Sequence, residues 1–120
     1  MAIIVKKFGG TSVGSVDLIR NIAKKIASGH REGDSLVLVV SAMAKTTDNL
    51  VRLAHEISDH PSRRELDMLL TAGERISMSL LSLALHKEGF GSISFTGSQS
   101  GIMTDDKHGN ARILNVSPLS

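Results

Sequence analysis

The chain alternates short apolar runs with stretches in which apolar residues recur at helical spacing. Residues 2–6 are mostly apolar and lead into Gly9 and Gly10, which predicts a short strand that ends in a glycine turn. Residues 36–40 (LVLVV) show no alternation, which is typical of a strand covered on both faces of a sheet. Residues 92–96 predict a third strand.

Helical spacing follows the first two strands. Ser15 has the side chain of an N-cap, and the apolar residues that follow, Leu18 included, predict an inward helical face up to Gly29. Thr47 or Asp48 can cap a second helix, which must end by Pro61.

A long helical stretch comes next. Ser62 and Glu65 have the spacing of a capping box, so a third helix is predicted to begin there. Gly73 is expected to interrupt it, and a fourth helix over residues 74–87 either stands alone or continues the third. Together, these elements predict one α/β domain with a mainly parallel sheet and right-handed crossovers.

The last part of the chain predicts a small β excursion. Residues 102–104 and 111–116 alternate apolar and polar side chains on either side of Gly109 and Asn110. Such a pattern around a Gly-Asn turn resembles a β-hairpin.

Composition excludes several classes of protein. Fourteen basic and twelve acidic residues are scattered along the 120 residues, without the basic stripe of a nucleic-acid binder. No apolar run approaches the roughly 20 residues of a membrane helix, and the start does not resemble a signal peptide. We therefore expect a cytoplasmic protein that binds neither nucleic acid nor membrane.

The strongest chemical feature is KFGGTS at residues 7–12, between the first strand and the first helix. Adjacent glycines let backbone N–H groups approach an anion, and Lys7 adds a full positive charge. The segment is neither a Walker A loop nor a G-x-G-x-x-G turn. Two interpretations remain open on these grounds: a phosphate-binding loop, or a tight turn with a surface lysine.

Three ordered motifs resemble aspartate kinases, a branch of the amino-acid kinase superfamily. KFGGTSVGS at residues 7–15 is similar to their opening signature, VVSAM at 39–43 to their second strand and substrate loop, and LLTAGER at 69–75 to their L-x-x-x-G-E helix. Residues 97–102 also resemble the family. The resemblance implies a three-layer α/β/α sandwich, of which this chain is the amino-terminal lobe.

The resemblance also implies roles for individual residues. The residues assigned to ATP are Lys7, Phe8, Gly9 and Gly10, with Lys7 catalytic. The residues assigned to aspartate are Ser41, Thr47 and Glu74.

Each aspartate-site residue also has an ordinary structural explanation. Ser41 can simply end a strand, Thr47 can cap a helix, and Glu74 can favour a helix start. The pair Asp105 and Asp106 suits a turn at least as well as a magnesium site, so no metal ligand is assigned.

The implied reaction is transfer of the ATP γ-phosphoryl group to the β-carboxylate of L-aspartate, with Mg²⁺ as the family's metal. We expect a homo-oligomer, and we expect residues 1–120 to be part of a longer protein, inactive without the nucleotide lobe and ACT regulatory domains of that family. Two alternatives remain open: another amino-acid kinase, or a non-catalytic interaction or regulatory fragment.

Overall fold

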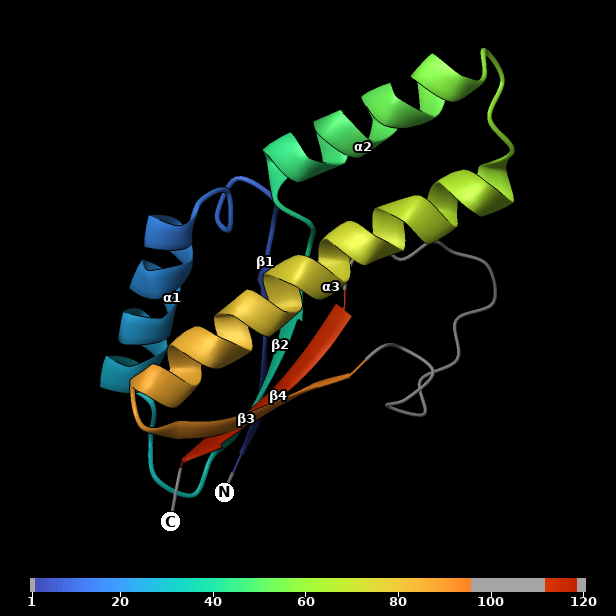
Figure 1. The fold of residues 1–120 in the computed structure, drawn as a ribbon. Coiled ribbons are helices and arrows are strands. Elements are labelled where there is room, and N and C mark those ends of the chain that lie inside the picture. Colours follow the sequence, from blue (N-terminus) through green and yellow to red (C-terminus); the bar gives the residue numbers. More distant parts are fainter. Residues whose placement is uncertain (1, 96–111, 119–120) are drawn as a thin grey trace.

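The computed structural model describes residues 2–95 and 112–118, which form one sheet with helices packed against it (Figure 1). The elements in chain order are β1 (Ile3–Phe8), α1 (Val16–Gly29), β2 (Ser35–Val40), α2 (Ala44–Ile57), α3 (Arg63–Lys87), β3 (Phe90–Phe95) and β4 (Arg112–Pro118). The three strands predicted in the first 96 residues are therefore confirmed.

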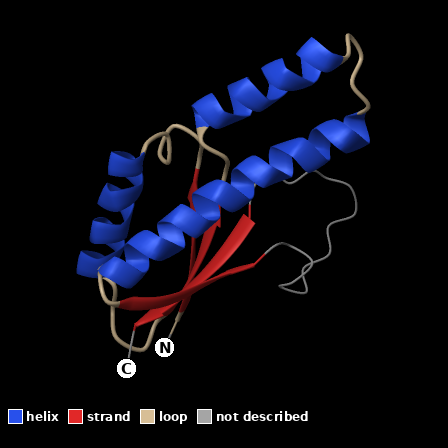
Figure 2. Cartoon of the chain, viewed as in Figure 1, coloured by secondary structure: helices blue, strands red, loops and turns tan. Residues whose placement is uncertain are grey.

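The sheet has the strand order β1-β2-β4-β3. β1 and β2 are parallel, from Ile3 opposite Ser35 to Phe8 opposite Val40. β4 pairs antiparallel with both β2 and β3. Three strands of the described sheet thus share one direction and β4 opposes them, which agrees with the α/β fold expected from the sequence. Figure 2 shows this sheet with the helices beside it.

The expected hairpin falls largely outside the described residues, which exclude 102–104 and the turn at 109–110. The described part, β4, lies in the interior of the sheet between β2 and β3. Its partners are β3, the strand directly before it in the chain, and β2, which is far from it in the sequence.

The main core lies between the sheet and one helical layer. Leu36, Leu38 and Val40 of β2 are buried, and they cluster with the inward faces of α1 and α3. On the opposite face of the sheet, Val5 and Ile93 are largely exposed to solvent. Among the described residues, β2 is therefore fully covered on one face only, so the expectation of cover on both faces is wrong for this part of the chain.

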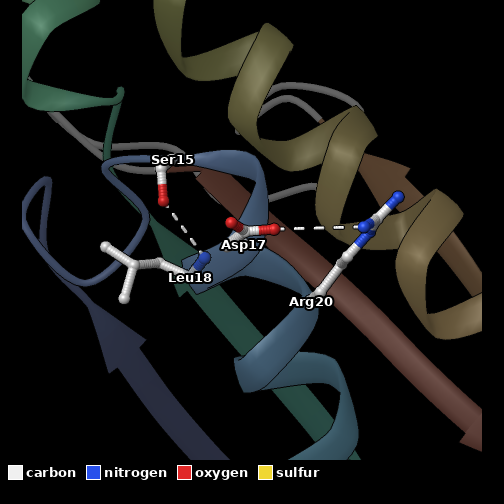
Figure 3. A network of polar contacts seen from close by, with 4 residues as sticks. All are labelled: Ser15, Asp17, Leu18 and Arg20. Atoms are coloured by element: carbon white, nitrogen blue, oxygen red, sulfur yellow. Dashed lines mark hydrogen bonds and ion pairs between the residues drawn. The ribbon is translucent and has the colours of Figure 1, made fainter.

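The N-terminus of α1 is capped as the sequence predicts. The Ser15 hydroxyl accepts a hydrogen bond from the N–H of Leu18 at 3.2 Å, and Asp17 approaches Arg20 at 3.9 Å (Figure 3). Ile19 and Ile26 face the core, whereas Leu18 is 41% exposed. The expectation that Leu18 points inward is wrong, because the helix packs the face that carries Ile19 and Ile26 against the sheet and Leu18 lies outside that face.

Replacing Ser15 by alanine is expected to lower the free energy of unfolding by about 1 kcal/mol, because one N-terminal amide loses its acceptor. Denaturant titration of the wild type and the variant measures this difference in the free energy of unfolding. Ser28→Ala is the matched control, since the Ser28 hydroxyl only donates to the carbonyl of Lys25 within the same helix. A loss as large for Ser28→Ala as for Ser15→Ala would contradict the capping assignment.

The second helix begins earlier than predicted. Its N-cap is Met43, which makes no side-chain cap, so Thr47 and Asp48 lie inside α2 and not at its start. At the next helix, the Ser62 hydroxyl accepts from the N–H of Glu65 at 3.2 Å, as the capping box predicts.

α3 continues without a break through Gly73, so the predicted interruption is wrong and the alternative, that the fourth helix continues the third, is confirmed. A Cβ at position 73 would lie 3.2 Å from the Cβ of Ala42 and 3.3 Å from Leu50 Cδ1. Gly73 therefore permits close packing of α3 against α2 and the loop before it, at the usual small cost in helix propensity.

α3 is the one described helix that is long and apolar enough to cross a membrane by length and composition. Leu81 and Leu85 on its inward face are buried in the core, and the Ser82 hydroxyl donates to the hydroxyl of Ser92 on β3 at 2.8 Å. The helix thus forms a layer of the α/β domain, packed across the sheet (Figure 1).

Candidate functional site

Two loops lie side by side at the carboxyl ends of β1 and β2. The N–H of Ser41 donates to the carbonyl of Phe8 at 3.1 Å, and the N–H of Ala44 donates to the carbonyl of Gly10 at 3.4 Å. The glycine loop after β1 is therefore held against the start of α2. Ligands of open α/β sheets gather at this end of the strands.

The glycine loop is shaped by its own backbone. The Gly9 carbonyl accepts from the N–H groups of Ser12 and Val13, at 3.1 and 3.2 Å. The side chain of Val13 is fully buried and anchors the loop to the core.

The two glycines of the loop differ in what surrounds them. A Cβ at Gly10 would lie 2.9 Å from the carbonyl oxygen of Ala42, so the neighbouring loop leaves no room for a side chain. At Gly9, no described atom lies within 4 Å of the Cβ position, and φ is outside the left-handed region. Packing thus explains Gly10 but not Gly9, where the open space suits close approach of a ligand.

Gly10→Ala is expected to lower the free energy of unfolding by about 1–3 kcal/mol, because the new Cβ collides with backbone. Gly9→Ala is the matched control and is expected to change it by less than about 0.5 kcal/mol. Chemical denaturation of both variants measures the difference. Equal stability losses would show that the loop does not have the observed packing.

Lys6 and Lys7 point to opposite faces of the sheet. Lys6 is in register with Leu38, which is fully buried under the helices, and it lines a groove with residues of α1. Lys7 is in register with Val39 and is exposed on the other face. Only Lys7 combines a position beside the glycine loop with the face that the described helices leave open.

Glu74 is buried on α3, with only 4% of its surface exposed. Its neighbour Gly73 packs against Ala42 and against Thr46 of the first turn of α2. Glu74 therefore lies next to the loop that begins at Ser41. It is well inside α3, so the explanation that it favours a helix start is wrong.

Ser41 and Thr47 lie at the two ends of this loop and first turn, and both are half-buried. The backbone N–H of Thr47 donates to the carbonyl of Met43 at 3.0 Å, as an ordinary helical bond. Thr47 does not cap α2, so its structural explanation does not hold either. Ser41 does end β2, and that explanation remains valid beside the functional one.

Ser77 is a residue that the sequence reasoning missed, and it holds the site together. Its fully buried hydroxyl lies 2.7 Å from the carbonyl oxygen of Ser41 and 3.1 Å from that of Glu74. It therefore ties the end of β2 to the helix that carries Glu74. The sequence feature that points to Ser77 is a polar residue four positions after Gly73, on the inward face of the helix.

No group of three or more histidine, aspartate or glutamate side chains suited to a metal ion occurs within residues 2–95 and 112–118. Asp105 and Asp106 lie outside this range. The described part of the site is thus a lysine, a glycine loop, two hydroxyl side chains and a buried carboxylate.

Comparison with known proteins agrees with this arrangement. The profile of the amino acid kinase family matches residues 2–119. The chain belongs to the amino acid kinase family. Within it, the resemblance to aspartate kinases is confirmed by curated relatives.

The aspartokinase of Geobacillus stearothermophilus is 54% identical over 116 residues, and aspartokinase 2 of Bacillus subtilis is also 54% identical over 116 residues. The aspartokinase of Corynebacterium glutamicum is 49% identical over 118 residues. These alignments cover 97–98% of this chain but only 28% of each relative.

A solved structure also matches, that of aspartate kinase from Synechocystis, with a TM-score of 0.76 and 56% identity. It covers 81% of this chain, which spans 17% of that structure. The amino-acid kinase α/β fold is therefore shown for this part of the family's length.

Proposed function

We propose that the protein carrying this chain is an aspartate kinase. It transfers the γ-phosphoryl group of ATP to the β-carboxylate of L-aspartate and forms 4-phospho-L-aspartate, the first step toward lysine, threonine and methionine. The observation that carries this proposal is the convergence of the glycine loop, the Ser41 loop and the buried Glu74 at one end of the parallel strand pair. The similar proteins named as aspartokinases support it.

Lys7, Phe8, Gly9 and Gly10 form the ATP side of the proposed site. The N–H groups of Ser12 and Val13 already donate to the carbonyl of Gly9, so we do not assign them to phosphate. We assign the phosphate contact to the open space beside Gly9, where a Cβ would meet no described atom. Phe8 packs against the core and fixes the end of β1, from which Lys7 projects. Lys7 then supplies positive charge to the phosphoryl group in transfer.

Ser41, Thr47 and Glu74 form the aspartate side. Hydroxyl groups at Ser41 and Thr47 donate to a carboxylate of the substrate, and the carboxylate of Glu74 accepts from its ammonium group. This contact with the ammonium group selects an amino acid over a simple dicarboxylate.

The chemistry needs no general base on the acceptor. The β-carboxyl group of aspartate ordinarily has a pKa of about 3.9 and is ionised near neutral pH, so one oxygen attacks the γ-phosphorus directly and ADP departs. The obstacle is repulsion between anions. The chain's contribution is therefore to orient the acceptor and place positive charge beside the transferring group.

Residues 1–120 supply the aspartate-binding lobe and one wall of the ATP site in this proposal. The nucleotide lobe and ACT regulatory domains belong to the remaining length of the protein. Mg²⁺ accompanies ATP and neutralises phosphate charge when bound, but no ligand for it is assigned among the described residues. We place the enzyme in the cytoplasm, as a homo-oligomer.

The test is ADP release by the full-length protein with ATP, Mg²⁺ and either aspartate, glutamate or N-acetylglutamate. Aspartate is expected to give a kcat/KM far above the other two. Preference for glutamate or N-acetylglutamate would assign the chain to another branch of the family. The isolated 120-residue chain is expected to give only background, and sustained aspartate-dependent turnover by it would contradict the lobe assignment.

A further inference from the structure

The backbone of Ser41 is held from two sides by hydrogen bonds to different elements. Its N–H donates to the carbonyl of Phe8, the last residue of β1, at 3.1 Å. Its carbonyl accepts from the hydroxyl of Ser77 on α3 at 2.7 Å, and Ser77 is fully buried. Because the Cα of Ser41 lies between these two bonds, together they fix the direction in which the Ser41 side chain leaves the loop.

The loop at residues 41–43 depends on such contacts, because it belongs to neither β2 nor α2. Thr47 is different, since it lies inside α2 and its N–H donates to the carbonyl of Met43 within that helix. A change at Ser77 therefore acts on Ser41 directly, whereas Thr47 keeps the hydrogen bonds of its own helix.

α3 contacts the loop at two positions that flank Glu74 along the helix. At Gly73, a Cβ would lie 3.2 Å from the Cβ of Ala42, so the helix and the loop are packed closely there. At Ser77, the contact is the hydrogen bond to the carbonyl of Ser41. The apolar contact limits how close the loop comes to Glu74, and the polar contact limits how far it moves away.

The hydroxyl of Ser77 also lies 3.1 Å from the carbonyl oxygen of Glu74 in its own helix. A hydroxyl carries a single proton to donate, and a serine inside a helix can always turn that proton toward the preceding turn. The shorter distance is nevertheless the one to Ser41. One oxygen atom thus lies within hydrogen-bond distance of the backbones of both residues that the proposed site places at opposite ends of the substrate.

We propose that Ser77 is a positioning residue that sets the separation of Ser41 and Glu74, and through it the length of amino-acid substrate that the site accepts. The inference rests on the proposed function, in which Ser41 binds a carboxylate and Glu74 binds the ammonium group. Glutamate is longer than aspartate by one methylene group, and such a difference is worth on the order of 10–200-fold in specificity in a well-fitted site. A site with fixed ends separates the two amino acids, and a site with a loose end accepts both.

Removing the hydroxyl in Ser77→Ala leaves the carbonyl of Ser41 without this donor, so the loop moves to find another partner. Aspartate must then reorder the loop when it binds, and its KM is expected to rise about tenfold. Glutamate needs a wider separation, so its inhibition constant as a competitor of aspartate is expected to stay within about twofold. The charge of Lys7 is untouched, and kcat at saturating aspartate is expected to stay within about threefold.

Initial rates of ADP release by the full-length protein, with aspartate varied at several fixed glutamate concentrations, give both constants. Neither depends on the fraction of enzyme that is folded. Ser82→Ala is the matched control, since Ser82 is 7% exposed on the same helix and its hydroxyl donates to that of Ser92 on β3 at 2.8 Å. Its two constants are expected to equal those of the wild type. Ser77→Cys keeps the volume with only a weak donor, and it supplies the same comparison if Ser77→Ala does not fold.

Two results would overturn the inference while leaving the proposed function in place. The first is a ratio of the glutamate inhibition constant to the aspartate KM that stays at the wild-type value in Ser77→Ala, or that falls equally in Ser82→Ala. The second is a loss of kcat at an unchanged aspartate KM, which would move the effect of Ser77 to phosphoryl transfer. Failure of the proposed function is recognised separately, because the wild type itself would then show no aspartate-dependent release of ADP.

Discussion

Replacing Lys7 by alanine in the full-length protein is expected to lower kcat by about a hundredfold or more while the fold remains intact. Lys7 is exposed at the end of β1 beside the glycine loop, so its removal creates no cavity. A preorganised charge next to the transferring phosphoryl group typically contributes roughly 3 kcal/mol to transition-state stabilisation. Steady-state ADP release at saturating aspartate and ATP measures kcat, and circular dichroism reports the fold.

Lys6→Ala is the matched control, since it removes the same charge one residue away. The register with Leu38 places Lys6 on the face of the sheet covered by α1, whereas Lys7, in register with Val39, lies on the open face. Its kcat is expected to stay within about threefold of the wild type. A normal kcat in Lys7→Ala, or a greater loss in Lys6→Ala, would move the phosphoryl-transfer site elsewhere.

The Glu74→Gln substitution is expected to reduce kcat/KM for aspartate by about a hundredfold, with the KM for ATP nearly unchanged. The change keeps the volume of a buried side chain and removes its charge. Neutralising one partner of a buried charge pair costs on the order of 2–5 kcal/mol in binding. Initial rates measured over a matrix of aspartate and ATP concentrations separate the two substrates.

Asp67→Asn supplies the control from the same helix, where Asp67 is exposed two turns before Glu74. Its kinetic constants are expected to remain near those of the wild type. The aspartate-site assignment fails if Glu74→Gln keeps a normal kcat/KM for aspartate, or if its main effect is on ATP.

Local signals in the sequence predict the elements well. Ser15 and Ser62 are recognisable as caps because the N-cap interaction spans only three residues and depends on side-chain chemistry visible in the sequence. The strands over 36–40 and 92–96 are recognisable because unbroken or β-rich apolar runs between turns leave few alternatives.

The errors occur where packing between segments that are distant in the sequence determines where a helix begins or whether it is interrupted. A local pattern predicts that Gly73 breaks a helix, yet it lies inside a continuous one. Position 73 is a glycine because Ala42 and Leu50 pack too close to leave room for a side chain. The same kind of pattern predicts Thr47 as the N-cap of α2, but the N-cap is Met43, four residues earlier, and the next amide, of Ala44, donates to the carbonyl of Gly10 in another loop. Neither contact is visible in a local pattern.

The candidate site shows the same division. Motif resemblance identifies Lys7 and Glu74, and the structure brings their segments to one end of the sheet. Their roles stay predictions until the variants above are measured. Ser77 belongs to none of these motifs, and its importance arises from its bonds to the carbonyls of Glu74 and of Ser41, which is 36 residues away in the sequence.

The interior position of β4 has a consequence for the order in which the domain forms. β1 and β2 can pair once the first 40 residues have left the ribosome, but β3 has no neighbour in the sheet until β4 arrives between it and β2. Contacts over such sequence distances slow folding, because the intervening chain must first be ordered. We therefore expect β3 and the edge of β2 to be the last parts of the sheet to gain protection from hydrogen exchange during synthesis, only after residue 118 has emerged.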